Sequence, residues 1–144
     1  MVPVIIQVKI GLLHHSGKSA HLVSRLSILE HIINRLQEVL EIDQIQLATT
    51  QAKTETPLIE IAKNLNIPVF QGSEDNVLDR FIQAGKTIGA QHLVRVCGDN
   101  PLIDIPLLRS LITAHIESNA DYTVPSDQIP LGVGCEVIRL EALK

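Results

Sequence analysis

Aromatic and sulfur-containing residues are scarce in this 144-residue chain, which has two Phe, one Tyr, no Trp and two Cys. Without aromatic side chains to stack on bases, a binding surface for single-stranded nucleic acid is excluded. The two cysteines, Cys97 and Cys135, are too few for the disulfide framework of a small secreted protein. We therefore expect two reduced, buried thiols.

An excess of positive charge and long apolar runs are also missing. The net charge is −4, which argues against a surface for duplex nucleic acid because such surfaces need clustered Lys and Arg. No apolar run has the length of a membrane span, and the first ten residues lack the basic region and cleavage site of a signal peptide. We expect a cytoplasmic protein that binds neither nucleic acid nor membrane.

Apolar residues, by contrast, make up 45% of the chain, enough for a packed core in a single domain over residues 1–144. Short β-branched runs alternate with segments of helical apolar spacing. The predicted strands cover residues 2–8, 45–49, 67–70, 92–96, 122–124 and 135–138, and the predicted helices cover 28–40, 56–65, 73–88 and 104–112. This alternation predicts a three-layer α/β/α protein whose helices cover both faces of a mostly parallel, Rossmann-like sheet.

Polar residues and a glycine mark the expected helix ends. Ser27 and Glu30 have the spacing of a capping box at the start of the first helix. Ser73 and Asp104 are expected to cap the third and fourth helices. Gly89 stands where a glycine would end the third helix.

The first predicted strand leads into residues 11–19, GLLHHSGKS, at the strand end where ligands of such folds bind. Backbone N–H groups and Lys18 suit a phosphate, and His14 could add a contact or simply be exposed. A P-loop has four residues between its glycines, whereas five separate Gly11 from Gly17, which disfavours a P-loop kinase or ATPase. Taken alone, the segment fits a solvated surface loop better than a phosphate site.

The fourth predicted strand leads into a second polar segment, residues 95–104, RVCGDNPLID. Asp99 follows a glycine at the strand end, where a carboxylate can hold Mg²⁺ between nucleotide phosphates. A structural role for Asp99 is an equally good interpretation of the sequence, and Asp104 is better explained as a helix cap. Cys97 has no His or Cys partner at metal-ligand spacing, which favours a buried thiol.

Several segments together carry a family resemblance: residues 47–50 (LATT), 68–80 (PVFQGSEDNVLDR), 95–104, 119–122 (NADY), 136–137 (EV) and 141–143 (EAL). The chain resembles the cytidylyltransferase family of spore-coat polysaccharide synthesis, which groups with the acylneuraminate and KDO cytidylyltransferases. The resemblance extends over the whole chain. It implies the nucleotide-diphospho-sugar transferase fold.

The resemblance implies that the first loop binds the triphosphate of CTP, with Mg²⁺ as cofactor. The family pattern QARxGSxRLPxK places Lys9 and His14 at its two arginines, and these replacements lose the planar guanidinium. The resemblance makes Asp99 the Mg²⁺ ligand and, with Lys18, a catalytic residue. The residues expected to bind the nucleotide are Gln7, Lys9, Gly11, His14, Gly17, Lys18, Arg80 and Gly98.

Other positions depart from the family pattern. Leu12 and Ser16 replace a serine and a proline in the loop, and Gly134 replaces an aspartate expected to help at the site. Family members continue past Lys144, so the fold is expected to be incomplete at its C-terminus, where a sugar pocket and a dimer arm would follow. The resemblance also allows a homodimer.

Two functions follow from these patterns. In the first, a sugar hydroxyl attacks the α-phosphate of CTP, CMP is transferred to the sugar and pyrophosphate leaves, with catalysis by positioning and charge neutralisation. In the second, the protein binds a nucleotide or a partner but has lost turnover. The first is the leading hypothesis, and the replacements at His14, Ser16 and Gly134 support the second.

Overall fold

The computed structural model describes residues 2–10, 20, 22–39, 41–126 and 128–144. In chain order its elements are β1 (Val4–Gln7), β2 (Leu22–Val23), β3 (Leu26–Ser27), α1 (Ile28–Leu36), β4 (Ile45–Thr50), the 3₁₀ helix η2 (Lys53–Glu55), α2 (Thr56–Asn64), β5 (Val69–Gly72), α3 (Val77–Thr87), β6 (His92–Cys97), α4 (Ile105–Ser118), β7 (Tyr122–Thr123), β8 (Glu136–Arg139) and the 3₁₀ helix η3 (Leu140–Leu143).

Six strands form one sheet in the order β5–β4–β1–β6–β8–β7. β1 pairs in parallel with both β4 and β6, and β4 pairs in parallel with β5. β8 is antiparallel to β6, and β7 is antiparallel to β8. The predicted mostly parallel sheet is confirmed, with an antiparallel pair at one side. β2 and β3 form a separate short hairpin.

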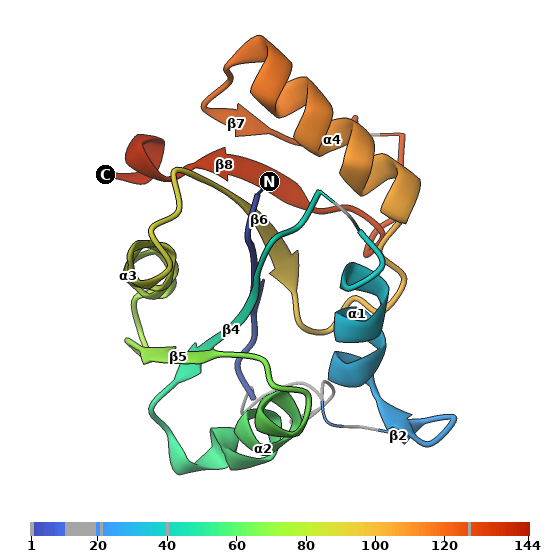
Figure 1. Ribbon diagram of the computed structural model, residues 1–144. Helices are drawn as coiled ribbons and strands as arrows, with labels where there is room; N and C mark the ends of the chain where they lie inside the picture. Colours follow the sequence, from blue (N-terminus) through green and yellow to red (C-terminus); the bar gives the residue numbers. More distant parts are fainter. Residues whose placement is uncertain (1, 11–19, 21, 40, 127) are drawn as a thin grey trace.

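Helices cover both faces of this sheet (Figure 1). Successive side chains of a strand point to opposite faces, so Val4 and Ile6 of β1 pack with α1, α2 and α4, whereas Ile5 packs with α3 and η3. The sheet therefore lies between two apolar cores. This arrangement confirms the predicted α/β/α layering.

Most local helix signals are confirmed. The Ser27 hydroxyl accepts a hydrogen bond from the Glu30 N–H at 3.1 Å, and the Glu30 carboxylate accepts one from the Ser27 N–H at 2.6 Å, which closes the capping box. Asp104 caps α4 by accepting from the Leu107 N–H at 2.8 Å. Gly89 follows α3 with φ of 63°, a left-handed conformation that suits glycine.

Three predicted helix bounds were wrong, and one of them is the end of α4, which runs to Ser118 and not to residue 112. Asn76, not Ser73, caps α3, because its side chain accepts from the Asp79 N–H at 2.9 Å, while the Ser73 hydroxyl accepts from Asn76 one turn earlier. α1 ends at Leu36, before the predicted residue 40. Val39 is buried, but it lies in the turn after the helix, so apolar spacing outlasts the helix itself. Among the helices that the structure describes, none combines the length and apolar character needed to span a membrane.

Candidate functional site

The strand order reverses between β1 and β6. From β1 the chain runs outward through β4 and β5 and then returns to form β6 on the other side of β1. In an open α/β sheet, such a switch point leaves a crevice at the carboxyl ends of the two strands, where ligands bind. Because β1 and β6 are parallel, residues 8–10 and the turn at residues 98–99 leave the same edge of the sheet.

Gly98 brings these two chain segments into contact. Its N–H donates to the Gln7 carbonyl at 2.9 Å. A Cβ atom at Gly98 would lie 2.6 Å from Cβ of Val8, so the close approach requires glycine. The ends of β1 and β6 are therefore held together through their backbones.

Asp99 stands at this edge with an exposed carboxylate. No hydrogen bond or ion pair joins that carboxylate to another described residue. Mg²⁺ bound with nucleotide phosphates needs only one or two protein carboxylates and keeps several waters, and Asp99 fits that requirement. Within the described part of the chain, no group of three or more His, Cys, Asp or Glu side chains could hold a metal ion by itself.

Two acidic residues hold the segment that follows β1. The Lys9 ammonium lies 3.4 Å from the Glu74 carboxylate and also donates to the Glu74 carbonyl. The Ile10 N–H donates to both carboxylate oxygens of Glu55, at 3.1 and 3.2 Å. The Lys9–Glu74 pair is partly exposed and therefore weak, so Lys9 could exchange Glu74 for a more highly charged anion.

Gln7 is tied to the sheet through its side chain. Its amide oxygen accepts from Nε of Arg95 at 2.7 Å, and Nη1 of Arg95 donates to Glu136 at 2.9 Å. Burial disfavours the charged guanidinium, but the hydrogen bond and charge of Glu136 outweigh it and raise the pKa of Arg95. These three hydrogen-bonded side chains connect β1, β6 and β8. They border a cavity of about 590 Å³ that Tyr122 also lines.

The Arg80 side chain is buried and contacts other protein groups. It is only 1% exposed, and Nη1 donates to the Ser73 carbonyl, while Nε has no partner among the described residues. Burial lowers the pKa of Arg80, and the negative charge of Glu55 offsets part of that effect. These contacts tie Arg80 to the protein interior, and its direct contact with a nucleotide stays a prediction.

The remaining predicted ligands, Gly11, His14, Gly17 and Lys18, lie outside the described residues. Their roles stay predictions. The described positions Gln7, Lys9, Gly98 and Asp99 gather at one edge of the sheet because β1 and β6 are adjacent and parallel.

Gly134, where the resemblance expects an aspartate, lines a cavity of about 390 Å³ beside the end of β6. A Cβ atom there would lie 2.7 Å from Cδ1 of Ile129 and 3.0 Å from Cγ of Pro125. A larger residue would have to displace these side chains. Gly134 therefore fits this loop as it is packed, and the aspartate of the family pattern is missing from it.

The cysteines are unpaired thiols. Cys135 is buried, and burial raises its pKa to about 12. Cys97 is only half-buried, which corrects the prediction of two fully buried thiols, although burial raises its pKa as well. A raised pKa makes a thiol a poorer nucleophile and metal ligand.

Glu55 is the residue at this edge that the sequence analysis missed. Its carboxylate is fully buried, which amphipathic spacing does not reveal for a charged residue. One signal could have found it: Glu55 lies in the connection after β4, whose carboxyl end meets that of β1 at the same edge.

Comparison with known proteins places these features in a family. A family model described as cytidylyltransferase matches residues 17–144. The spore coat polysaccharide biosynthesis protein SpsF of Bacillus subtilis is 30% identical over 143 residues, which are 96% of this chain and 59% of that protein. An uncharacterized protein of Methanocaldococcus jannaschii is 36% identical over 140 residues, 97% of this chain and 57% of that protein.

Solved structures are also similar to this chain. A cytidylyltransferase from Leptospira borgpetersenii has a TM-score of 0.92 at 27% identity, covering 99% of this chain and 61% of that one. A CMP:2-keto-3-deoxy-manno-octonic acid synthetase complexed with CTP has a TM-score of 0.77 at 14% identity, covering 99% and 75%, and shares the fold. The chain spans less than two thirds of the length of the two curated relatives.

Proposed function

Because the chain belongs to the cytidylyltransferase family, we propose that it transfers CMP from CTP to a sugar hydroxyl and releases pyrophosphate. One observation carries the proposal. Residues 8–10, which lead into the first loop, and the Gly98–Asp99 turn leave one edge of the sheet at its topological switch point. The spore coat polysaccharide protein among the relatives supports a sugar as the acceptor.

The proposed chemistry depends on placing the acceptor oxygen in line with the α-phosphate and on neutralising the triphosphate. Lys9, which lies just before the first loop, would leave Glu74 and contact the phosphates. Lys18 would neutralise charge from the loop itself. Asp99 would hold a Mg²⁺ ion, which supplies positive charge to the phosphates when it is bound.

The test is release of pyrophosphate from CTP, ATP, GTP or UTP in the presence of Mg²⁺ and candidate sugars, together with calorimetry of nucleotide binding. We expect turnover with CTP. Asp99→Asn should weaken Mg²⁺-dependent CTP binding at least about tenfold, the scale of one lost interaction with a charged group, without unfolding the protein. Asp104→Asn is the matched control, because asparagine also caps a helix and this exposed carboxylate has no proposed role with the nucleotide.

Equal affinity of the parent and Asp99→Asn for Mg²⁺–CTP would contradict the proposed ligand. Loss of folding in Asp99→Asn would show instead that Asp99 is structural.

A second function is favoured by Gly134, which replaces the aspartate of the family pattern at a position where a side chain would have to displace Ile129 and Pro125. In this alternative the protein binds CTP but does not turn it over. Calorimetry would then show Mg²⁺–CTP binding, while no pyrophosphate would appear with any sugar.

A further inference from the structure

Glu55 is a carboxylate with no exposure at the edge of the sheet where the nucleotide site is proposed. Burying a carboxylate costs free energy unless hydrogen bonds and charge compensate it. Here the Thr49 hydroxyl donates to Glu55 at 2.6 Å, and the Ile10 N–H donates to both carboxylate oxygens. The guanidinium of Arg80 adds a favourable charge from the β5–α3 side. The carboxylate is thus fully engaged inside the protein.

Glu55 is not needed to cap α2. It occupies the N-cap position, but its side chain makes no capping hydrogen bond. Its longest-range contact in sequence is instead with the backbone of Ile10, 45 residues away. The contact therefore joins the segment after β1 to the connection that follows β4.

This contact completes a clamp on Lys9. On one side of Lys9, the Val8 N–H donates to the Ala48 carbonyl at 3.1 Å. On the other side, Glu55 holds the Ile10 N–H. The backbone on both sides of Lys9 is thus held by β4 and the residues after it, while the Lys9 ammonium rests on the exposed Glu74.

We propose that Glu55 is a positioning residue for Lys9: by fixing the Ile10 N–H, its buried carboxylate aims the lysine at the triphosphate of the bound nucleotide. The inference rests on the proposed function, in which Lys9 binds phosphate. A lysine has a flexible stem and a point charge, so fixing its backbone limits the positions that the ammonium can reach. Thr49 supports Glu55 by orienting the carboxylate.

The test is a double-mutant cycle on Mg²⁺–CTP affinity, measured by calorimetry on the parent, Glu55→Gln, Lys9→Ala and the double variant. Glu55→Gln keeps the shape but loses the charge, and we expect about tenfold weaker binding, the scale found when a group that orients a ligand-binding residue is removed. Thr49→Val should weaken binding in the same direction by less. In the Lys9→Ala background, Glu55→Gln should have little further effect, because its route through Lys9 is gone.

Two further measurements separate positioning from general destabilisation. Hydrogen exchange at the Ile10 amide should be faster in Glu55→Gln than in the parent. Ile33→Val, a change in the core at α1, should lower the free energy of unfolding and leave CTP affinity unchanged.

The outcomes distinguish the inference from the proposed function. A parent that does not bind CTP overturns the proposed function, and the inference falls with it. A parent that binds CTP while Glu55→Gln binds equally well overturns the inference alone. Additive effects of Lys9→Ala and Glu55→Gln would also overturn it.

Discussion

Gly98 sets how closely the ends of β1 and β6 approach each other. Adding a methyl group in Gly98→Ala would place Cβ 2.6 Å from Cβ of Val8, which is fixed to the backbone and cannot swing away. The two strand ends would have to separate. We expect a loss of about 1–3 kcal/mol in the free energy of unfolding, the usual cost of overpacking, measured by urea denaturation.

Gly89 offers a control for this substitution. Unlike Gly98, it has a positive φ, and a Cβ atom there would meet nothing within 4 Å. Asparagine tolerates that backbone conformation, so Gly89→Asn should change the free energy of unfolding far less than Gly98→Ala. If Gly98→Ala were as stable as the parent, the close approach of the two strand ends would be contradicted.

The sequence predicts residues of this edge unevenly. Asp99 could be singled out because it follows a recognisable strand, and strand ends are where ligands bind. Glu55 and Arg80 could not be placed inside the protein, because spacing treats a charged residue as exposed. Their burial depends on partners 25 to 45 residues apart in the chain, Ile10 for Glu55 and Glu55 for Arg80, which one-dimensional patterns do not contain.

At the scale of elements, α4 depends on its N-cap. The Asp104 side chain accepts from the Leu107 N–H at 2.8 Å, and Pro106 suits the first turn. Asp104→Ala should lower the free energy of unfolding by about 1 kcal/mol, the cost of a lost cap, whereas Asp104→Asn should change it by only a few tenths. Thermal or urea unfolding of both variants makes the measurement. Equal losses in the two would show that charge, not capping, is what Asp104 contributes.

Element boundaries show where sequence patterns stop being informative. The six strands of the sheet and the four α-helices were predicted in the right order, because burial of one face imposes a period that the sequence must follow. The short hairpin of β2 and β3 was not predicted. The start of α3 was wrong because two polar residues, Ser73 and Asn76, both offer capping oxygens, and only the backbone decides between them. The apolar pattern of β8 likewise did not predict that this strand pairs antiparallel with β6.

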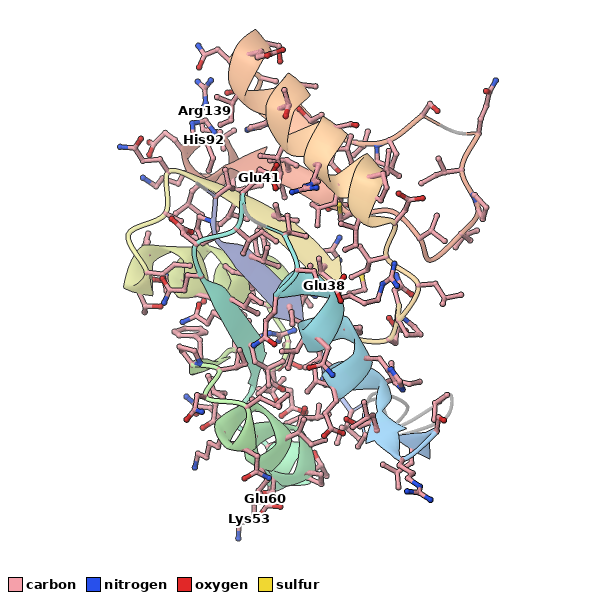
Figure 2. The ribbon with its side chains drawn as sticks, turned by 45° about the vertical axis from the view of Figure 1, so that its right-hand side comes forward. Glu38, Glu41, Lys53, Glu60, His92 and Arg139 are labelled. Atoms are coloured by element: carbon pink, nitrogen blue, oxygen red, sulfur yellow. The ribbon has the colours of Figure 1, made fainter. Side chains whose placement is uncertain are left out.

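At the scale of the whole molecule, a pair of histidines joins three elements at the edge opposite the proposed site. His92 begins β6 and lies beside Arg139, at the end of the molecule far from Lys53 and Glu60 of the α2 region (Figure 2). Its Nδ1 lies 3.0 Å from Nε2 of the fully buried His115 on α4. Nδ1 of His115 lies 2.8 Å from the Thr123 hydroxyl on β7.

Both histidines hold fewer protons in the folded protein than in the unfolded chain at mildly acidic pH. Burial lowers the pKa of His92, and Arg139 lowers it further. Burial also lowers the pKa of His115, as do the nearby His92 and Arg139, while Asp121 acts in the opposite direction. In the unfolded chain each histidine titrates near its ordinary pKa of about 6.5.

The direction of the pH effect follows from this difference. Well above pH 6.5 neither state is protonated at these groups, so they do not change stability with pH. As the pH falls through about 6.5 and below, the unfolded chain takes up protons first and is stabilised relative to the folded protein. The free energy of unfolding should therefore fall with decreasing pH, by at most about 1.4 kcal/mol per pH unit for each histidine, and by less for the half-buried His92.

Replacing His115, the buried histidine, measures its contribution to the pH dependence of the free energy of unfolding. In His115→Gln the unfolded chain takes up one proton fewer, so the slope of unfolding free energy against pH between about 6.5 and 5 should decrease, although the variant is less stable at neutral pH through its lost contacts with His92 and Thr123. Ile112→Val, a change in the α4 core with no titratable group, should lower stability and leave the slope as in the parent. The measurement is urea denaturation of the three proteins at half-unit steps of pH. An unchanged slope in His115→Gln would mean that His115 is protonated in the folded protein and that the interior between α4 and β7 carries a charge.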